Sequence, residues 1–291
     1  MPSVKTILIT GANGQLGSEF KALSTSFAQY NFLFTDKEDL PIDDIAAIKN
    51  FFEQHNISHC INCAAYTAVD KAESEKEIAY LINATAAGNL AVVCKMYNAA
   101  FIHISTDYVF DGNGARPYKE SSPTSPVNEY GFTKLKGEEL VLQNNPAALI
   151  IRTSWVYSRF GNNFVKTMLR LMKERESINV VSDQQGCPTY AADLATAIMQ
   201  VIESAGFTKK NRPSIFNYSN EGIISWYDFA VAIKELSGSN CKVNAIPTLQ
   251  YPTPAKRPHY SVMDTTLIKN TFGVTIPFWK DSLEKCLQLL K

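Results

Sequence analysis

The sequence predicts an α/β protein, built on a doubly wound parallel sheet with a smaller, interleaved second domain towards the C-terminus. Short apolar runs typical of buried strands alternate with helical periodicity through the first half of the chain. The first apolar run passes directly into a glycine-rich turn and a helix start, over residues 5–17. Sequences with this alternation bury a parallel sheet beneath helices on both of its faces.

The expected elements follow in order along the chain. Strands are expected at residues 5–10, 31–35, 58–64, 101–105 and 148–152, with helices between them, including a long one over about 72–97. Beyond residue 155 we expect helices at 163–175 and 191–203 and strands at 178–181 and 214–218. Ser225 and Asp228 then form a capping box for a helix that Gly238 ends, and two short helices follow. We expect one domain over residues 1–155 and a second mainly over 156–291, with about 190–220 returning to the first.

The composition excludes several classes of protein. The chain has 291 residues, 45% of them hydrophobic, and its 28 basic residues balance 28 acidic ones. A chain without net charge has no overall field that favours nucleic acid or an anionic membrane. No charged-then-apolar leader precedes Val4, and no apolar run approaches the ~20 residues of a membrane span. We therefore expect a cytoplasmic protein with neither a nucleic-acid nor a membrane partner.

Six cysteines are scattered along the chain, and Cys60 and Cys63 have the spacing of a redox motif. This pair lies in an expected buried strand, where residues three apart point to opposite faces, whereas a redox pair lies at a helix N-terminus. Nowhere in the sequence do cysteines and histidines have the spacing of zinc ligands. We expect structural cysteines and no metal site.

The glycine-rich turn is the first candidate site. Gly11, Gly14 and Gly17 are spaced three apart between an apolar strand and a helix start. Glycine permits positive φ and the close approach of a phosphate, and a helix N-terminus offers free N–H groups to it. The spacing differs from the G-x-G-x-x-G of dehydrogenase folds, so a turn without a ligand is the alternative. The position near the N-terminus favours a diphosphate site in a Rossmann-like first βα unit.

A second candidate site combines a phenol, an ammonium and a hydroxyl. Tyr130 and Lys134 are four residues apart and share a helix face. Tyrosine has a pKa of ~10, so it is a poor acid near neutrality unless a cation such as Lys134 stabilises its anion. Thr106 ends an expected strand, where ligands of open α/β sheets collect, and could bond a carbonyl oxygen while Tyr130 donates a proton. A surface helix pair and a strand-end cap are the alternatives.

Five ordered motifs carry a family resemblance. They are Gly11-x-x-Gly14-x-x-Gly17, Asn62-Cys63-Ala64-Ala65-Tyr66-Thr67, Ser105-Thr106-Asp107-Tyr108-Val109-Phe110, Tyr130-x-x-x-Lys134 and Arg152-Thr153-Ser154-Trp155-Val156-Tyr157. The series resembles the extended short-chain dehydrogenase/reductases, and within them the dTDP-4-dehydrorhamnose reductases. The resemblance continues through residues 161–164, 183–189 and 252–258, so it covers nearly the whole chain.

This resemblance implies that NADPH or NADH delivers a hydride to the C4 ketone of dTDP-6-deoxy-L-lyxo-4-hexulose, which gives dTDP-L-rhamnose. It implies that Tyr130 donates the proton, that Lys134 lowers the pKa of Tyr130 and holds the nicotinamide ribose, and that Thr106 binds the reacting oxygen. The other residues implied for the cofactor are Gly11, Asn13, Gly14, Gln15, Leu16, Gly17, Asp36, Lys37, Ile42, Ala64, Ala65 and Tyr66. Those implied for the substrate are Thr106, Asp107, Trp155, Asn163, Gln185, Thr189 and Arg257, with Trp155 against the deoxysugar.

The adenosine end departs from the family pattern. Pro41 stands where family members usually place an acidic residue near the adenine, and it offers neither a donor nor a carboxylate. The contact to the adenine is in doubt, or Asp39 or Asp43 makes it in place of residue 41. Asp36 would bind ribose hydroxyls, whereas Lys37 would attract a 2′-phosphate, so NAD and NADP both stay open.

The sequence leaves alternatives open for the oligomeric state and for the exact reaction. Glu19 matches one glutamate of the magnesium-linked dimers described in this family, but Ala192 replaces another, so we expect a monomer or a metal-independent homodimer. Related 4,6-dehydratases have a glutamate where this chain has Tyr108, which cannot eliminate water. Another sugar-nucleotide reductase or epimerase remains an alternative. A non-catalytic regulatory subunit is the alternative from a different class, and the intact Thr106, Tyr130 and Lys134 set argues against it.

Overall fold

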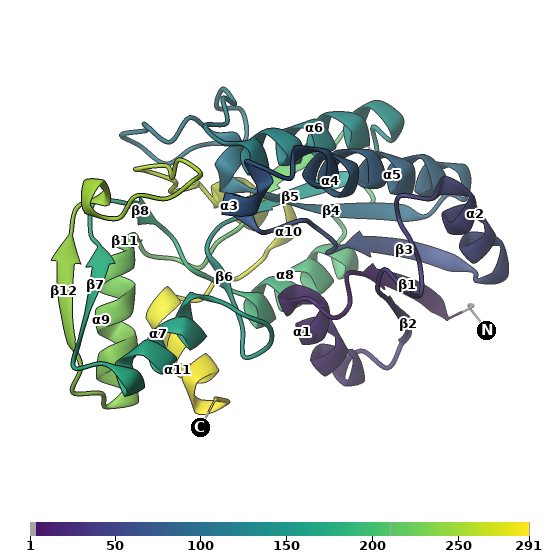
Figure 1. Cartoon of the computed structure of the whole chain (residues 1–291). Coiled ribbons are helices and arrows are strands. Elements are labelled where there is room, and N and C mark those ends of the chain that lie inside the picture. The colour runs from purple at the N-terminus through teal and green to yellow at the C-terminus, as the bar shows by residue number, and fades with distance from the viewer. Residues whose placement is uncertain (1–3, 210, 291) are drawn as a thin grey trace.

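The computed structural model describes residues 4–209 and 211–290. Its centre is a six-stranded parallel sheet in the order β10-β5-β4-β3-β1-β2 (Figure 1). The strands are β1 Lys5–Thr10, β2 Tyr30–Thr35, β3 Ile57–Asn62, β4 Ala100–Thr106, β5 Leu149–Thr153 and β10 Ile215–Asn217. The predicted doubly wound sheet is confirmed, and these strands begin and end within about two residues of the predicted positions.

Helices cover both faces of the sheet (Figure 1). One face carries α1 Gln15–Leu23 and α8 Ala191–Glu203, and the other carries α2 Ile45–Gln54, α5 Ala86–Met96 and α6 Glu129–Asn144. Successive strand residues point to opposite faces, so Ile7 packs in one apolar cluster and Leu8 in the other. Cys60 and Cys63 divide between the two clusters in the same way, as expected for a structural pair.

The long helix expected over residues 72–97 is interrupted. Short helices α3 Val69–Ala72 and α4 Lys76–Tyr80 precede a π-helical turn, η2 Leu81–Thr85, which continues into α5. Contrary to the expectation that no apolar run approaches the length of a membrane span, Lys76–Met96 is long and apolar enough to cross one. Core helices pass the same test, and this stretch packs against α2 and α6 with 56% of its most apolar window buried in the protein.

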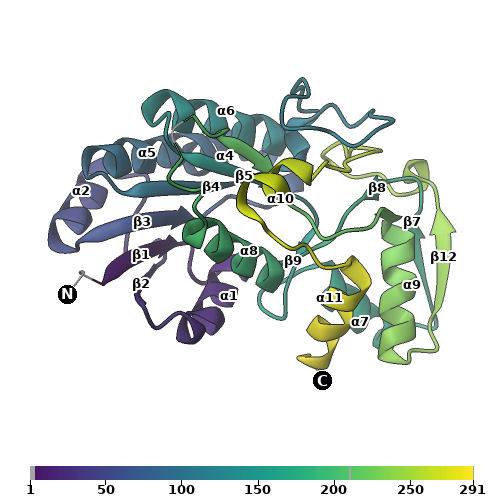
Figure 2. The same cartoon turned by 180° about the vertical axis from the view of Figure 1, so that it is seen from behind.

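A small lobe lies beside the sheet (Figure 2). It contains the strand pairs β7 Ser177–Val181 with β12 Lys242–Ile246, β8 Gln185–Gly186 with β11 Ile224–Ser225, and β6 Val156–Tyr157 with β9 Thr189–Tyr190. Helices α7 Phe164–Glu174, α9 Trp226–Ser237 and α11 Trp279–Gln288 share an apolar core with them. The predicted capping box of Ser225 and Asp228 begins α9, and Gly238 ends it with φ 69°.

The six-stranded sheet and the helices on it form the main lobe, which also takes residues from the second half of the chain. β10 pairs with β5, and α8 and α10 Thr266–Phe272 pack in the apolar cluster on one face of the sheet. Short 3₁₀ turns, η1 Ser24–Ser26, η3 Asp107–Val109 and η4 Thr248–Gln250, complete the elements. The domain boundary at residue 155 stays a prediction.

Candidate active site

The glycine turn lies at the carboxyl ends of β1 and β3. Gly11 has φ 64°, and a Cβ there would lie 2.6 Å from the Ala64 backbone nitrogen. A Cβ on Gly17 would lie 2.4 Å from the Gly11 carbonyl oxygen. Side chains at these two positions would collide with backbone atoms, so the close approach of α1 to the residues after β3 requires glycine.

Two cavities open beside the turn, and their walls share Gly14, Cys63 and Ala65. Among the residues predicted for the cofactor, the first cavity, of about 580 Å³, is lined by Gly11, Gly14, Asp36, Lys37, Ile42, Ala64 and Ala65. The second, of about 600 Å³, is lined by Gly14, Gln15, Leu16, Ala65, Tyr130 and Lys134. A long ligand can therefore extend from the first cavity into the second.

Three residues predicted for the cofactor support these walls. The Asn13 N–H donates to Asp36, Gly17 packs on the turn, and the backbone of Tyr66 exchanges hydrogen bonds with the Asn83 amide. None of the three lines either cavity, and their contact with the cofactor stays a prediction.

The rim of the first cavity carries charges of both signs. Asp36 accepts hydrogen bonds from the backbone N–H groups of Asn13 at 3.0 Å and Lys37 at 2.8 Å. The exposed Lys37 ammonium lies 3.4 Å from the Glu38 carboxylate. Pro41 and Asp43 both line this cavity. Asp36 is thus placed for ribose hydroxyls and Lys37 for a 2′-phosphate, on adjacent residues.

Thr106, Tyr130 and Lys134 line the second cavity together. Thr106 ends β4, and the other two lie in the first turns of α6, whose N-cap Asn128 accepts a hydrogen bond from the Gly131 N–H at 2.8 Å. A Cβ on Gly131 would lie 2.3 Å from the carbonyl oxygen that follows β4 at Tyr108. This close packing brings the start of α6 to the carboxyl end of β4, where Thr106 and Tyr130 line the same cavity.

The titration of Tyr130 differs from the expectation. Burial raises the pKa of Tyr130 to about 12, and the neighbouring Thr106 hydroxyl offsets this rise only in part. The expected lowering of that pKa by Lys134 is not found: the buried Lys134 ammonium donates to the Ile104 carbonyl at 2.7 Å, and burial lowers its own pKa to about 8. Tyr130 is consequently protonated at neutral pH, the form that a proton donor needs.

Asp107 is a buried carboxyl beside the catalytic candidates. Burial raises its pKa to about 7, although the hydrogen bond from Thr106 opposes the shift. Thr106 Oγ1 donates to Asp107 Oδ1 at 3.0 Å. An ionised Asp107 therefore accepts the hydrogen bond from the Thr106 hydroxyl, whereas a neutral Asp107 leaves that hydroxyl free to donate into the cavity.

Sequence reasoning missed the residues that fix α6. Arg152 on β5 forms a buried ion pair with Glu138 at 2.6 Å, and the Ser105 hydroxyl donates to the same carboxylate at 2.6 Å. Asn83 in η2 donates to Thr133 Oγ1 at 3.0 Å. One signal was available: Glu138 lies four residues after Lys134 on the same helix face, and Arg152 interrupts an apolar strand.

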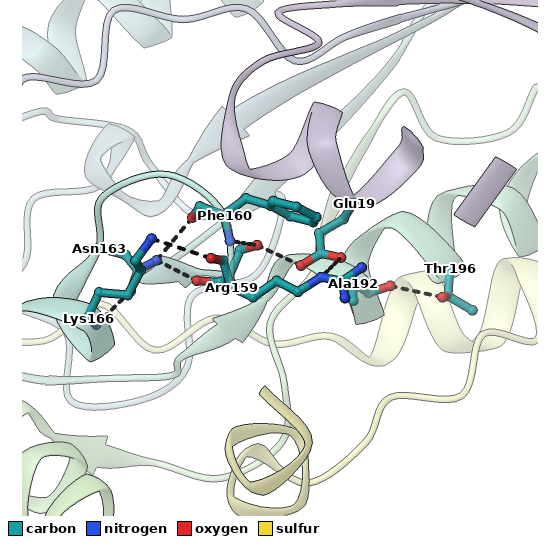
Figure 3. A network of polar contacts seen from close by, with 8 residues as sticks. Glu19, Arg159, Phe160, Asn163, Lys166, Ala192 and Thr196 are labelled. Atoms are coloured by element: carbon teal, nitrogen blue, oxygen red, sulfur yellow. Dashed lines mark hydrogen bonds and ion pairs between the residues drawn. The ribbon is translucent and has the colours of Figure 1, made fainter. Parts of the chain in front are cut away.

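The structure brings some of the predicted substrate residues to the second cavity. Asp107, Trp155 and Asn163 line it with Thr106. The Asn163 amide is committed to the protein, because it donates to Gln15 Oε1 at 3.0 Å. It also accepts from the Lys166 N–H at the start of α7 (Figure 3). Asn163 therefore links the small lobe to the first turn of α1.

The other predicted substrate residues lie elsewhere. Arg257 lines a third cavity, of about 510 Å³, where it pairs with Asp70 at 2.9 Å. Thr189 is fully buried and accepts a hydrogen bond from the Thr153 hydroxyl at 3.2 Å. Gln185 is exposed on β8, and it is the preceding residue, Gln184, that lines the third cavity.

The third cavity adjoins the second. Tyr108 and Trp226 belong to the walls of both. The three cavities thus form a continuous series, with Thr106, Tyr130 and Lys134 in the middle one. Such a series can hold two elongated ligands whose ends meet in the middle.

Comparison with known proteins identifies the family. The family model described as "RmlD substrate binding domain" matches residues 5–291. A dTDP-4-dehydrorhamnose reductase from Aggregatibacter actinomycetemcomitans is 40% identical over 96% of this chain and 97% of its own. The chain belongs to the dTDP-4-dehydrorhamnose reductase family.

Two solved structures of dTDP-4-dehydrorhamnose reductases are similar to this chain in sequence and fold. A dTDP-4-dehydrorhamnose reductase from Clostridium acetobutylicum has 43% identity and a TM-score of 0.92, covering 98% of this chain and 99% of its own. One from Bacillus anthracis, solved in complex with NADP, has 39% identity and a TM-score of 0.91, covering 99% and 100%. These matches confirm the predicted family, the fold and the enzyme class, an NAD(P)-dependent oxidoreductase.

Proposed function

We propose that this chain reduces the C4 ketone of dTDP-6-deoxy-L-lyxo-4-hexulose with NADPH or NADH and so forms dTDP-L-rhamnose. The observation that carries the proposal is that Thr106, Tyr130 and Lys134 line the middle one of three adjoining cavities. The first cavity has the glycine turn and Asp36 for the adenosine half of the cofactor, and the third leaves room for the nucleotide of the substrate.

The residues of the middle cavity supply acid chemistry. The bound nicotinamide provides the hydride for the carbonyl carbon. Thr106 hydrogen-bonds the carbonyl oxygen, and Tyr130 donates its phenolic proton to that oxygen as negative charge develops on it. Lys134 lies on the same helix face and in the same cavity, and we assign it to the hydroxyls of the nicotinamide ribose. When Asp107 is neutral, the Thr106 hydroxyl is free to donate to the substrate instead of to Asp107.

The third cavity suits the dTDP group. Arg257 places a guanidinium there with 20% of its side chain exposed, and guanidinium groups bind diphosphate oxygens in pairs. Asp70 holds this guanidinium in place in the free protein. Tyr108 and Trp226, at the junction with the middle cavity, separate the nucleotide from the sugar.

We also propose that the chain acts as a monomer or as a homodimer that needs no metal. Glu19 on α1 is 4% exposed, accepts a hydrogen bond from the Ser158 hydroxyl at 2.6 Å, and lies 4.0 Å from Arg159 (Figure 3). A carboxylate engaged in this way inside the protein is poorly placed to bridge a metal between subunits. Ala192, nearby on α8, offers no ligand. The cytoplasmic location and the absence of nucleic-acid and membrane partners stay predictions.

One assay tests the reaction, the cofactor and the nucleotide together. NADPH and NADH oxidation is followed with dTDP-, UDP- and GDP-linked 4-keto-6-deoxy sugars, and the product is identified by NMR. We expect turnover with the dTDP sugar and a 6-deoxy-L-mannose product. Faster turnover of another nucleotide or sugar would indicate a different sugar-nucleotide reductase. No turnover, with tight binding to a second protein, would favour a regulatory subunit.

A further inference from the structure

Trp155 adopts an unusual conformation at the edge of the middle cavity. It follows β5 with φ 47°, in the left-handed region that bulky side chains rarely occupy. Its indole stacks on that of Trp226, with ring centroids 3.6 Å apart and planes 12° from parallel. A residue held in such a backbone conformation needs surroundings that fix it, and these conformations concentrate at functional sites.

The surroundings of Trp155 come from the small lobe. A Cβ on Gly186 of β8 would lie 2.6 Å from Trp155 Cε2, so the ring needs glycine there. β8 pairs with β11, whose last residue, Ser225, caps α9 and directly precedes Trp226. Phe164 of α7 packs on Trp226 with centroids 4.6 Å apart. The β8–β11 strand pair thus positions two residues around the Trp155 ring. Gly186 leaves room for the ring, and Trp226, directly after β11, stacks on it.

We propose that Trp226 is a positioning residue for the sugar: it holds the Trp155 indole, in its left-handed conformation, as the wall of the middle cavity against which the sugar packs. The proposal rests on the proposed function, which places the sugar in that cavity. Both indoles line the cavity, and Trp226 also reaches the wall of the third cavity. An indole face suits the apolar C–H face and methyl group of a deoxysugar.

A change at Trp226 should weaken binding of the sugar nucleotide and leave binding of the cofactor unchanged. Trp226 lies on the small lobe and is not among the residues that line the first cavity. Trp226→Leu removes the stack and should raise KM for the sugar nucleotide about tenfold, with the Kd of NADPH unchanged within about twofold. Trp226→Phe keeps an aromatic face against Trp155 and should restore KM to within about threefold of the original protein. A merely structural role predicts loss of thermal stability with the two affinities affected alike.

Circular dichroism tests the stack without relying on activity. Two stacked indoles give an exciton couplet, which should be present in the full chain and absent from both Trp155→Phe and Trp226→Phe. The matched control is Trp279→Phe, because Trp279 is the remaining tryptophan and lies in the core of the small lobe, so its variant should retain the couplet. Titration with dTDP-glucose, a stable sugar nucleotide, should change the couplet.

The outcomes distinguish this proposal from the proposed function. No couplet in the full chain, or an unchanged KM in Trp226→Leu, would overturn the role of Trp226 while leaving the reductase activity intact. A protein that turns over no 4-keto sugar, yet whose couplet responds to dTDP-glucose, would overturn the reaction and support the stack as a sugar-nucleotide wall. A couplet unaffected by saturating dTDP-glucose would overturn the role of the stack in binding.

Discussion

The main lobe and the small lobe hold their functional side chains by different means. In the main lobe, Thr106 follows a parallel strand, and α6 is fixed by the buried pair of Glu138 and Arg152. In the small lobe, two-residue strands carry little backbone pairing, and Trp155 is held by an aromatic stack and a glycine. The comparison suggests that the catalytic groups are rigid by virtue of the sheet, whereas the sugar wall depends on side-chain packing.

The largest effect is expected from breaking the buried pair. Glu138→Gln leaves the 3%-exposed Arg152 guanidinium without its counter-ion and should lower the free energy of unfolding by about 3–5 kcal/mol. The matched control is Glu139→Gln, which breaks a solvent-exposed pair with Lys136 on the same helix and should cost less than about 1 kcal/mol. Urea unfolding measures both. Equal small losses would show that the pair does not anchor α6.

The next effect concerns Asp107 and pH. Its pKa is raised to about 7, so the folded protein keeps this proton between about pH 4 and pH 7, where the unfolded chain loses it. The contribution of Asp107 to stability therefore falls as the pH rises through that window. Asp107→Asn removes this dependence and should raise the free energy of unfolding by about 4 kcal/mol above pH 7, with little change near pH 4. Parallel pH–stability curves for the two proteins would contradict this.

A smaller effect is expected at Arg257, in the wall of the third cavity. Arg257→Gln removes the guanidinium available to the diphosphate and should raise KM for the dTDP sugar about tenfold. Because its ion pair with Asp70 is partly exposed, stability should change by less than about 1 kcal/mol. Steady-state kinetics and thermal unfolding measure the two effects. An unchanged KM would remove Arg257 from the nucleotide site.

The smallest effect is expected at the rim of the first cavity. Lys37→Ala removes an exposed cation and should raise KM for NADPH about threefold with no change for NADH, since an exposed charge pair is worth less than about 1 kcal/mol. Glu38→Ala, the matched control, removes the neighbouring anion and should lower KM for NADPH. Equal effects on both cofactors would indicate that Lys37 does not meet a 2′-phosphate.

The sequence predicted the strands of the main lobe closely, because the signal for each strand lies within its own segment. The apolar period marks each strand, and in the small lobe Ser225 with Asp228 gives an equally local signal for the start of α9. It could not place Gln185 and Thr189, because two-residue strands such as β8 and β9 have no period, and their pairing joins distant segments. The raised pKa of Tyr130 was also out of reach, since burial depends on how α6 packs on the sheet.

The proton-donor role of Tyr130 is the central claim. Turnover of dTDP-6-deoxy-L-lyxo-4-hexulose is measured in Tyr130→Phe, with Tyr97→Phe as the control, because Tyr97 is partly buried at the end of α5 and lines none of the three cavities. We predict a fall in kcat of about 10²–10⁴-fold in Tyr130→Phe, with the Kd of NADPH unchanged and the control fully active. A Tyr130→Phe protein that keeps kcat within about tenfold would contradict the role of Tyr130 as the proton donor.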